Sequence, residues 1–236
     1  MQNSQQFNLS GVHMWFIEYY KSQMESRYRK KLKNKQFTIL TGSCIGGVIY
    51  NHLGLRFNSP TINMWFTPHD VIKLCSDLDY YMGCDLIFDV EPHGDCPNSP
   101  AARLGEEERA ISLYFNHYHS EDEAREKWES RKKRIIKDCI YVITTDYQLD
   151  NEDILKLKQM DCCRYVVFTS RKRDDIPNSF YIKSLKKCND SDLHMVTMNE
   201  ITGMRTWEHE FDYVKWLNGK SSYRKHTVWN LLAGFL

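Results

Sequence analysis

Short apolar runs alternate with helical patterns along most of this chain. Strands are expected near 37–40, 62–66, 86–88, 110–115, 140–143, 165–168, 180–182 and 194–196. Amphipathic or capped helical stretches separate several of them. Strands that are almost entirely apolar and alternate with helices indicate a largely parallel sheet covered on both faces. We therefore predict an α/β fold, with a mostly parallel or mixed sheet in one compact domain over 36–236.

A long N-terminal helix is predicted over about 10–33, so that 1–35 forms a helical segment packed on the domain. Its aromatic residues lie toward its start, and its end is rich in Lys and Arg. Cations at a helix C-terminus suit the helix dipole, which favours a solvated helix end. The alternative is a docking patch for an anionic surface, such as the inner face of a membrane, or for a phosphorylated ligand.

The segment 115–134 is predicted to run from a strand into a capped helix. Ser120 and Glu123 have the spacing of a capping box, in which each side chain accepts a hydrogen bond from a free backbone N–H. Ala124, Trp128 and Arg131 then lie on one helix face. An Arg on an inward face needs a carboxylate, a phosphate or several carbonyls as partners. Arg131 therefore either forms a structural ion pair or binds a ligand.

Composition excludes some functions. The 236 residues are 42% hydrophobic, which allows a sizeable core, and 32 Lys and Arg nearly balance 31 Asp and Glu. That balance argues against nucleic-acid binding. No apolar run approaches the length that spans a bilayer, and the first residues do not resemble a signal peptide, so a cytoplasmic protein is expected. The eight cysteines are scattered without metal-ligand spacing, so most are expected to be small buried hydrophobic residues, and neither a disulfide scaffold nor structural zinc is expected.

A glycine-rich turn follows the first predicted strand, at 41–47, and leads into a helix. A strand, a tight turn and a helix aim backbone N–H groups at an anion, although the spacing of known nucleotide motifs is missing. The candidate ligand-binding residues here and in the next turn are Ser43, Gly46, Gly47, Ser59 and Thr61. The alternative is a turn that needs small residues for packing.

Polar residues follow several predicted strands, and the carboxyl ends of parallel strands meet at one edge of a sheet. The candidate catalytic residues at these positions are Cys44, His117, His119 and Asp146. Cys44 is a possible nucleophile, because the N-terminus of a helix lowers the pKa of a thiol and either His can act as its base. The alternative for Cys44 is a small residue packed at a turn.

His117 and His119 share one face if their segment is extended. They then suit a metal site with Glu121 or Asp146, or a general base acting on a sugar hydroxyl. No spacing defines a metal, so none is predicted. Lys127, Arg131 and Arg134 follow on the predicted helix and can hold a diphosphate or a carboxylate. A solvated basic helix end explains Lys127 and Arg134 equally well.

Four blocks together resemble a bacterial family: 28–40, 43–55, 58–61 and 115–134. The chain resembles exopolysaccharide-biosynthesis proteins of capsule and surface-glycan gene clusters, a domain of unknown function, from about Tyr28 to about Ser170. That family often has Asn-Asn before the cysteine, where this chain has Gly42-Ser43. It commonly has Leu-Gly-Asp where this chain has Leu104-Gly105-Glu106. The resemblance implies a role in surface-polysaccharide synthesis and no particular mechanism.

Three functions agree with these patterns. The first is a cytoplasmic transferase that adds or modifies a sugar, with an activated sugar or an acyl compound as donor and His117 as base. The second is a non-catalytic accessory protein that binds the polysaccharide-assembly machinery or a lipid-linked glycan through the N-terminal helix. The third is a hydrolase that uses Cys44. The sequence indicates no particular cofactor.

Overall fold

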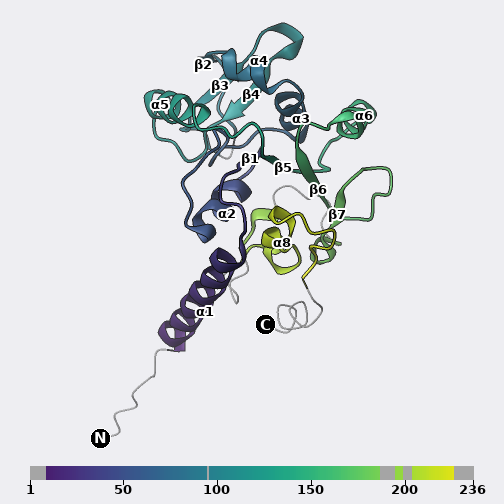
Figure 1. Cartoon of the computed structure of the whole chain (residues 1–236). Coiled ribbons are helices and arrows are strands. Elements are labelled where there is room, and N and C mark those ends of the chain that lie inside the picture. Colours follow the sequence, from purple (N-terminus) through teal and green to yellow (C-terminus); the bar gives the residue numbers. More distant parts are fainter. Residues whose placement is uncertain (1–8, 95, 187–194, 199–203, 226–236) are drawn as a thin grey trace, which may run out of the picture.

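The computed structural model describes residues 9–94, 96–186, 195–198 and 204–225. These residues form two β-sheets with helices around them (Figure 1). The larger sheet consists of β1 (Thr38–Thr41), β5 (Ile140–Thr145), β6 (Arg164–Thr169) and β7 (Ser179–Tyr181). These four strands pair in the order β1-β5-β6-β7, and every pairing is parallel. The predicted α/β fold with a mostly parallel sheet is confirmed.

The apolar side chains of this sheet divide between its two faces, as the alternation of a strand requires. On one face, Ile39, Ile143 and Phe168 are buried against α2 (Ile45–Leu53) and α8 (Tyr213–Leu217). On the other face, Leu40 and Val142 are buried against α3 (Pro68–Ser76) and α6 (Asn151–Gln159). Helices therefore cover both faces, which explains why the central residues of these strands are apolar on both sides.

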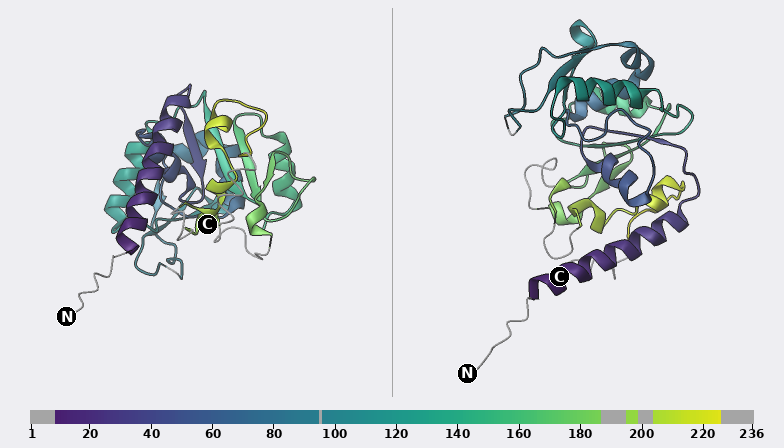
Figure 2. Two further views of the ribbon diagram at one scale, coloured as in Figure 1. Left: turned by 90° about the horizontal axis from the view of Figure 1, so that it is seen from below. Right: turned by 90° about the vertical axis from the view of Figure 1, so that its left-hand side faces the viewer.

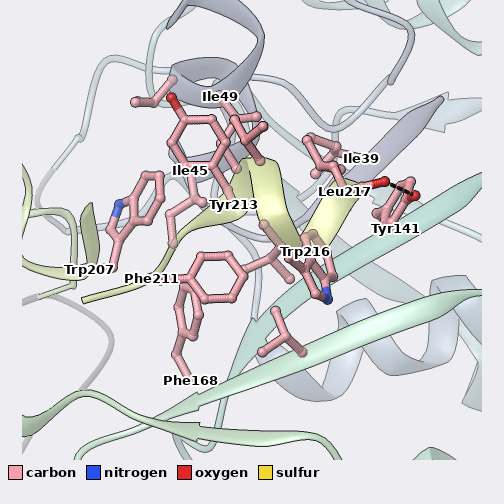
Figure 3. Close-up of a cluster of buried hydrophobic side chains, with 14 of the residues drawn as sticks. Ile39, Ile45, Ile49, Tyr141, Phe168, Trp207, Phe211, Tyr213, Trp216 and Leu217 are labelled. Atoms are coloured by element: carbon pink, nitrogen blue, oxygen red, sulfur yellow. Dashed lines mark hydrogen bonds between the residues drawn. The ribbon is translucent and has the colours of Figure 1, made fainter. Parts of the chain in front are cut away.

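Aromatic rings fill the core under α8 (Figure 3). Phe211 packs edge-on against Phe168, with ring centres 4.9 Å apart, and Trp216 lies 5.0 Å from Tyr141. The Tyr141 hydroxyl donates a hydrogen bond to the Leu217 carbonyl at 2.8 Å and so joins β5 to the end of α8. These contacts attach the C-terminal elements to the sheet. The sequence pattern over 207–217, which ends before Gly219, predicts a single closing helix. The structure instead has a 3₁₀ helix, η3 (Thr206–His209), and the separate α8.

A second, antiparallel sheet lies beyond α3 (Figure 1). It consists of β2 (Leu86–Ile87), β3 (Ala101–Leu104) and β4 (Ile111–Tyr114), in that order. The sequence pattern predicted β2 and β4 but not β3, a four-residue strand that directly follows a proline-rich stretch of the sequence, 91–100. α4 (Leu78–Gly83), η1 (Glu107–Arg109) and α5 (Glu121–Lys132) accompany this sheet. β4 therefore does not belong to the parallel sheet.

An irregular segment, 58–66, covers the outer edge of β1. The Thr41 N–H donates to the Thr61 hydroxyl at 3.1 Å, and the Thr38 hydroxyl donates to the Asn58 carbonyl at 2.9 Å. A buried strand was predicted over 62–66. That prediction is wrong, because only Trp65 makes a β-bridge, with Tyr114 of β4. Asn63 interrupts the extended chain with φ of 59°, a conformation that Asn tolerates better than most residues.

The N-terminal helix α1 (Leu9–Lys31) projects from the domain in two views (Figures 1 and 2). Its C-terminal part is anchored to the domain. Arg29 donates through Nε to the His52 carbonyl of α2 at 2.9 Å, and Tyr28 packs edge-on against Tyr213. The described residues include no helix with both the length and the apolar character to cross a membrane.

Two further expectations concern the C-terminal third. A strand was predicted over 194–196, but Met195 and Val196 are helical, and His194 lies outside the described residues. η2 (Lys183–Leu185) follows β7. Most cysteines were expected to be buried, and that expectation is wrong for the seven described positions: Cys75 is buried, Cys162 is exposed and the other five are half-buried. Cys188 lies outside the described residues.

Candidate functional site

A thiol and an imidazole meet at the carboxyl edge of the parallel sheet. Sγ of Cys44 lies 3.2 Å from Nε2 of His117. Cys44 ends the turn between β1 and α2, and its carbonyl accepts the first hydrogen bond of α2 from Val48 N–H at 3.1 Å. Cys44 is half-buried and His117 is exposed, so a ligand can reach the pair from solvent. The structure thus joins two of the four predicted catalytic residues.

The position of His117 follows from contacts of its neighbours. β4 bridges to Trp65 through two backbone hydrogen bonds with Tyr114, at 2.8 and 2.9 Å. The Tyr118 hydroxyl then donates to the Ile62 carbonyl at 2.7 Å. Segment 58–66 is itself bonded to β1, so the turn that carries His117 is fixed next to the turn that carries Cys44. Sequence reasoning did not identify Tyr118 as the anchor of this turn.

The first turn of α2 presents free backbone donors beside Cys44. The N–H groups of Gly46 and Gly47 have no hydrogen-bond acceptor among the described residues. Both glycines are closely packed, so a side chain at either position would displace a neighbouring side chain. A Cβ at Gly46 would lie 2.9 Å from Cγ2 of Thr41, and one at Gly47 would lie 2.6 Å from Oδ1 of Asn63. The N-terminus of a helix attracts negative charge, so these donors suit an oxyanion that forms next to the thiol.

The electrostatics of Cys44 correct one expectation from the sequence. We expected the helix N-terminus to lower the pKa of the thiol. Burial instead raises the pKa of Cys44, and the positive charge of Arg205 only partly opposes it. Desolvation penalises the thiolate more than the charge of Arg205 favours it. The thiol therefore needs a base to remove its proton, and His117 is in hydrogen-bond contact to do so.

The pair has no third member of the kind that orients the histidine in a catalytic triad. Among the described residues, no carboxylate bonds to the ring of His117. Arg205 is the nearby charge that sequence reasoning missed. Its N–H donates to Oε2 of Glu208 at 2.7 Å, and its guanidinium lies 3.8 Å from the same carboxylate. No sequence signal connects Arg205 with Cys44, which lies 161 positions earlier.

His119 does not share the face of His117. The prediction assumed an extended segment, but a turn forms here, with Tyr118 N–H donating to the Phe115 carbonyl at 2.9 Å. His119 lies at the start of α5. Ser120 caps that helix by accepting from Glu123 N–H at 3.1 Å. The carboxylate of Glu123 accepts from the N–H of His119, and not from that of Ser120, so the capping box is shifted by one residue.

The candidate ligand-binding hydroxyls divide into an open and a buried group. Ser43 bonds to the Thr41 hydroxyl at 3.1 Å beside Cys44 and is only half-buried. Ser59 and Thr61 are both fully buried and lie 3.2 Å apart, oxygen to oxygen. Thr61 completes the hydrogen bonding at the edge of β1, as described above. Ser59 and Thr61 therefore support the sheet from within and do not face a ligand.

The basic residues of α5 differ in burial. Lys127 is half-buried on α5, whereas Arg131 is buried, with 9% of its surface exposed. The prediction that Arg131 points inward is confirmed. Its Nη1 donates to the Tyr118 hydroxyl at 2.5 Å and to the Ile62 carbonyl at 3.4 Å. Arg134 lies one turn later and is half-buried. Neither arginine pairs with a described carboxylate.

Asp146 lies at the same sheet edge but in a different environment. Its carboxylate is 3.4 Å from Nη1 of Arg173, and Arg173 also bonds to Asp175 at 2.7 Å. Thr144 lies near the end of β5, and its buried Oγ1 has no partner. Thr144 lines a small enclosed space together with Ser43 and Gly42. The structure thus places Asp146 in an ion-pair network with Arg173 and Asp175.

One cluster with metal-ligand chemistry was not predicted from the sequence. His69, Asp150 and Asp153 have ligand atoms within 4.8 Å of one another. The buried Asp153 accepts from the His69 ring at 2.7 Å and from Asp150 N–H at 3.3 Å, and Asp150 and Asp153 form the capping box of α6. These internal bonds explain the cluster without an ion. His69 and Asp153 are 84 residues apart, so no local pattern could connect them.

The fold and the site define an α/β protein with a cysteine–histidine pair at the carboxyl edge of a parallel sheet. Residues 16–218 match the family described as a domain of unknown function (DUF1919), and the chain belongs to that family. It is also similar to a protein of Haemophilus influenzae described as uncharacterized. The two are 31% identical over 193 residues, which cover 80% of this chain and 88% of that protein.

Proposed function

We propose that this protein is a thiol-dependent acyltransferase that modifies a sugar during surface-polysaccharide synthesis in the cytoplasm. The observation that carries the proposal is the 3.2 Å contact between the Cys44 thiol and the His117 imidazole. A nucleophile in hydrogen-bond contact with a base, at the start of a helix, is the arrangement of covalent acyl transfer. The polysaccharide context rests on the sequence resemblance alone.

The first half-reaction transfers the acyl group to the enzyme. Nε2 of His117 takes the proton from Cys44, and the thiolate adds to the carbonyl carbon of an acyl ester or thioester. The negative oxygen that forms is stabilised by the N–H groups of Gly46 and Gly47, which have no other acceptor among the described residues. When the carbonyl reforms, the bond to the leaving group breaks, and His117 returns the proton to that group.

The second half-reaction regenerates the thiol. A sugar hydroxyl adds to the acyl carbon of the Cys44 thioester while His117 takes the hydroxyl proton. Cleavage of the carbon–sulfur bond yields the sugar ester, and the proton returns from His117 to the Cys44 sulfur. Water in place of the sugar gives hydrolysis by the same steps. The hydrolase hypothesis therefore differs from the transferase only in the acceptor.

The test is capture of the acyl-enzyme. The protein is mixed with acetyl-CoA or with an activated acetyl ester, quenched in acid and weighed intact, and the modified peptide is mapped. We expect one acetyl group on Cys44, and none on that peptide in Cys44→Ala. The matched control is Cys84→Ser, because Cys84 is also half-buried but bonds to a backbone carbonyl, that of Tyr80. Acetylation that persists in Cys44→Ala, or equal loss in Cys84→Ser, would contradict the proposal.

A docking role is the second candidate, and one observation favours it. Trp15 and Tyr19 of α1 are 63% and 53% exposed, and their rings stack 5.7 Å apart. Exposed aromatic residues are common where a protein meets a membrane or a partner. The absence of any adduct on Cys44 with every donor tested would favour this role over the acyltransferase.

A further inference from the structure

Arg131 is a buried cation with unused donors. Its guanidinium carries five N–H donors, and both of its hydrogen bonds come from Nη1. The acceptors are a hydroxyl and a carbonyl, and no described carboxylate pairs with it. A buried charge without an opposite charge is costly, and hydrogen bonds to neutral groups compensate only part of that cost. The remaining donors of Arg131 therefore suit an anion.

Arg134 also has a hydrogen-bond donor without an acceptor among the described residues. Its Nε is buried and has no hydrogen-bond partner among the described residues. Burial, together with repulsion from Arg56 and Arg131, lowers the pKa of its guanidinium. Desolvation is the larger cause of this shift, and the repulsion shows that Arg56 and Arg131 lie close enough for their charges to act on Arg134.

Arg56 completes the cluster from another part of the chain. The guanidinium of Arg131 lies 5.4 Å from the ring centre of Phe57, the residue that follows Arg56. Arg56 itself is exposed and forms no ion pair with a described residue. α5 and the segment after α2 thus bring three arginines together without a described acidic partner. Such a concentration of like charge destabilises the fold unless an anion binds there.

We propose that Arg56, Arg131 and Arg134 form a binding site for the phosphate groups of a soluble phosphate ester or diphosphate. Planar guanidinium groups match phosphate oxygens with paired hydrogen bonds. The burial of Arg131 favours a small soluble ligand over a lipid headgroup, which would have to reach below the protein surface. This site would bind its ligand without catalysing a reaction. It is therefore a second function, separate from the proposed acyl transfer.

The phosphate site and the cysteine–histidine pair are connected through Tyr118. The Tyr118 hydroxyl bonds to Arg131, and His117 is its preceding neighbour in the chain. Arg131 therefore helps to hold the turn that carries His117. Phosphate binding is nevertheless independent of the thiol, so Cys44→Ala is expected to bind diphosphate with unchanged affinity. The two proposals can then fail separately.

Calorimetric titration with inorganic diphosphate tests the site, with sodium chloride of matched ionic strength as the reference. We expect saturable binding to the full chain, about tenfold weaker in Arg134→Gln and in Arg56→Gln. The matched control is Lys133→Gln, which removes the same charge from an exposed residue next to Arg134. Lys133→Gln should bind as the parent protein does.

Three results would overturn the proposal. One is no binding of diphosphate by the folded parent protein. Another is equal weakening in Lys133→Gln and Arg134→Gln, which would indicate unspecific attraction. The third is binding to vesicles of phosphatidylglycerol that depends on Arg134 while diphosphate does not bind, which would assign the arginines to a lipid surface. Circular dichroism of each variant establishes that it is folded.

Discussion

The carboxyl edge of the parallel sheet has two halves that differ in how completely their polar groups are paired. Beside β1, the Cys44 thiol faces the His117 ring, and the N–H groups of Gly46 and Gly47 are free among the described residues. Beyond β5 and β6, Asp146 pairs with Arg173, and the Thr169 hydroxyl donates to the Arg171 carbonyl at 2.6 Å.

This difference distinguishes residues that can take part in a reaction from residues that stabilise the fold. Both halves contain residues of reactive types. Because all of them follow a strand, the sequence alone marks those of either half as candidates. The carboxylate of Asp146 must break an ion pair before it can act on a ligand, whereas the contact between Cys44 and His117 is itself the one through which a base takes the proton of a thiol. The partner that each group has in the folded state, and not its residue type, therefore identifies the β1 half as the candidate site.

The largest expected effect in this comparison belongs to His117. His117→Ala should slow acylation of Cys44 by about 10²- to 10⁴-fold, because the thiol then loses its proton only to solvent. His119→Ala is the control, since the bond from His119 to Glu123 comes from its backbone. Rapid-quench mass spectrometry measures both rates. An equal loss in the two variants would show that the whole segment matters, and not a base at position 117.

Asp146→Asn should affect stability and leave the acylation rate unchanged. It weakens a partly buried ion pair with Arg173, so the free energy of unfolding should fall by about 1–3 kcal/mol, while the acylation rate of the folded protein stays unchanged. Urea unfolding measures the first quantity. Asp175→Asn is the control and should cost less, because Asp175 is exposed. A collapse of acylation with unchanged stability would place Asp146 in the active half.

The smallest expected effect concerns pH and Arg205. Burial raises the pKa of Cys44, so the thiolate is scarce at neutral pH and becomes populated only as the pH rises through that raised value. Alkylation of the Cys44 peptide by iodoacetamide should therefore keep accelerating above about pH 8.5, the ordinary value for cysteine. Removal of a favourable positive charge raises the pKa further, and Arg205→Gln should slow alkylation at pH 8 by about two- to tenfold.

The matched control for Arg205 is Lys220→Gln, which removes an exposed charge near the C-terminal end of α8. It should leave the alkylation profile unchanged. A rate that already levels off near pH 7 in the parent protein would mean that the thiol is ionised at rest. The helix end would then outweigh burial, and His117 would not be needed as a base.

Much of the architecture could be predicted because it depends on local patterns. Runs that are apolar on both faces, such as 140–143, predict strands covered by helices. The cap of α3 was also predictable, because Thr67 accepts from Asp70 N–H as its spacing requires, with Pro68 at the first helical position. Arg131 was correctly placed on the inward face of its helix from a 3.6-residue period.

Errors occurred where a local pattern competes with partners elsewhere in the chain. Segment 62–66 is apolar enough for a strand, but Asn63 turns it, and its backbone bonds to Tyr114 at one position only. His117 and His119 were placed on one face because a strand was assumed to continue. The turn at Tyr118 separates them, and Tyr118 is fixed by Ile62, 56 residues earlier.

The sequence by itself determined the α/β class, most elements, the turn that presents Cys44 and the inward direction of Arg131. Each follows from residues within one or two helical turns of one another. Only the tertiary structure decided that Cys44 meets His117, that β4 belongs to a second sheet, and that Arg131 has no described carboxylate partner. Those outcomes depend on contacts between residues tens of positions apart, and the free energy of such contacts is set by the packing of the whole chain.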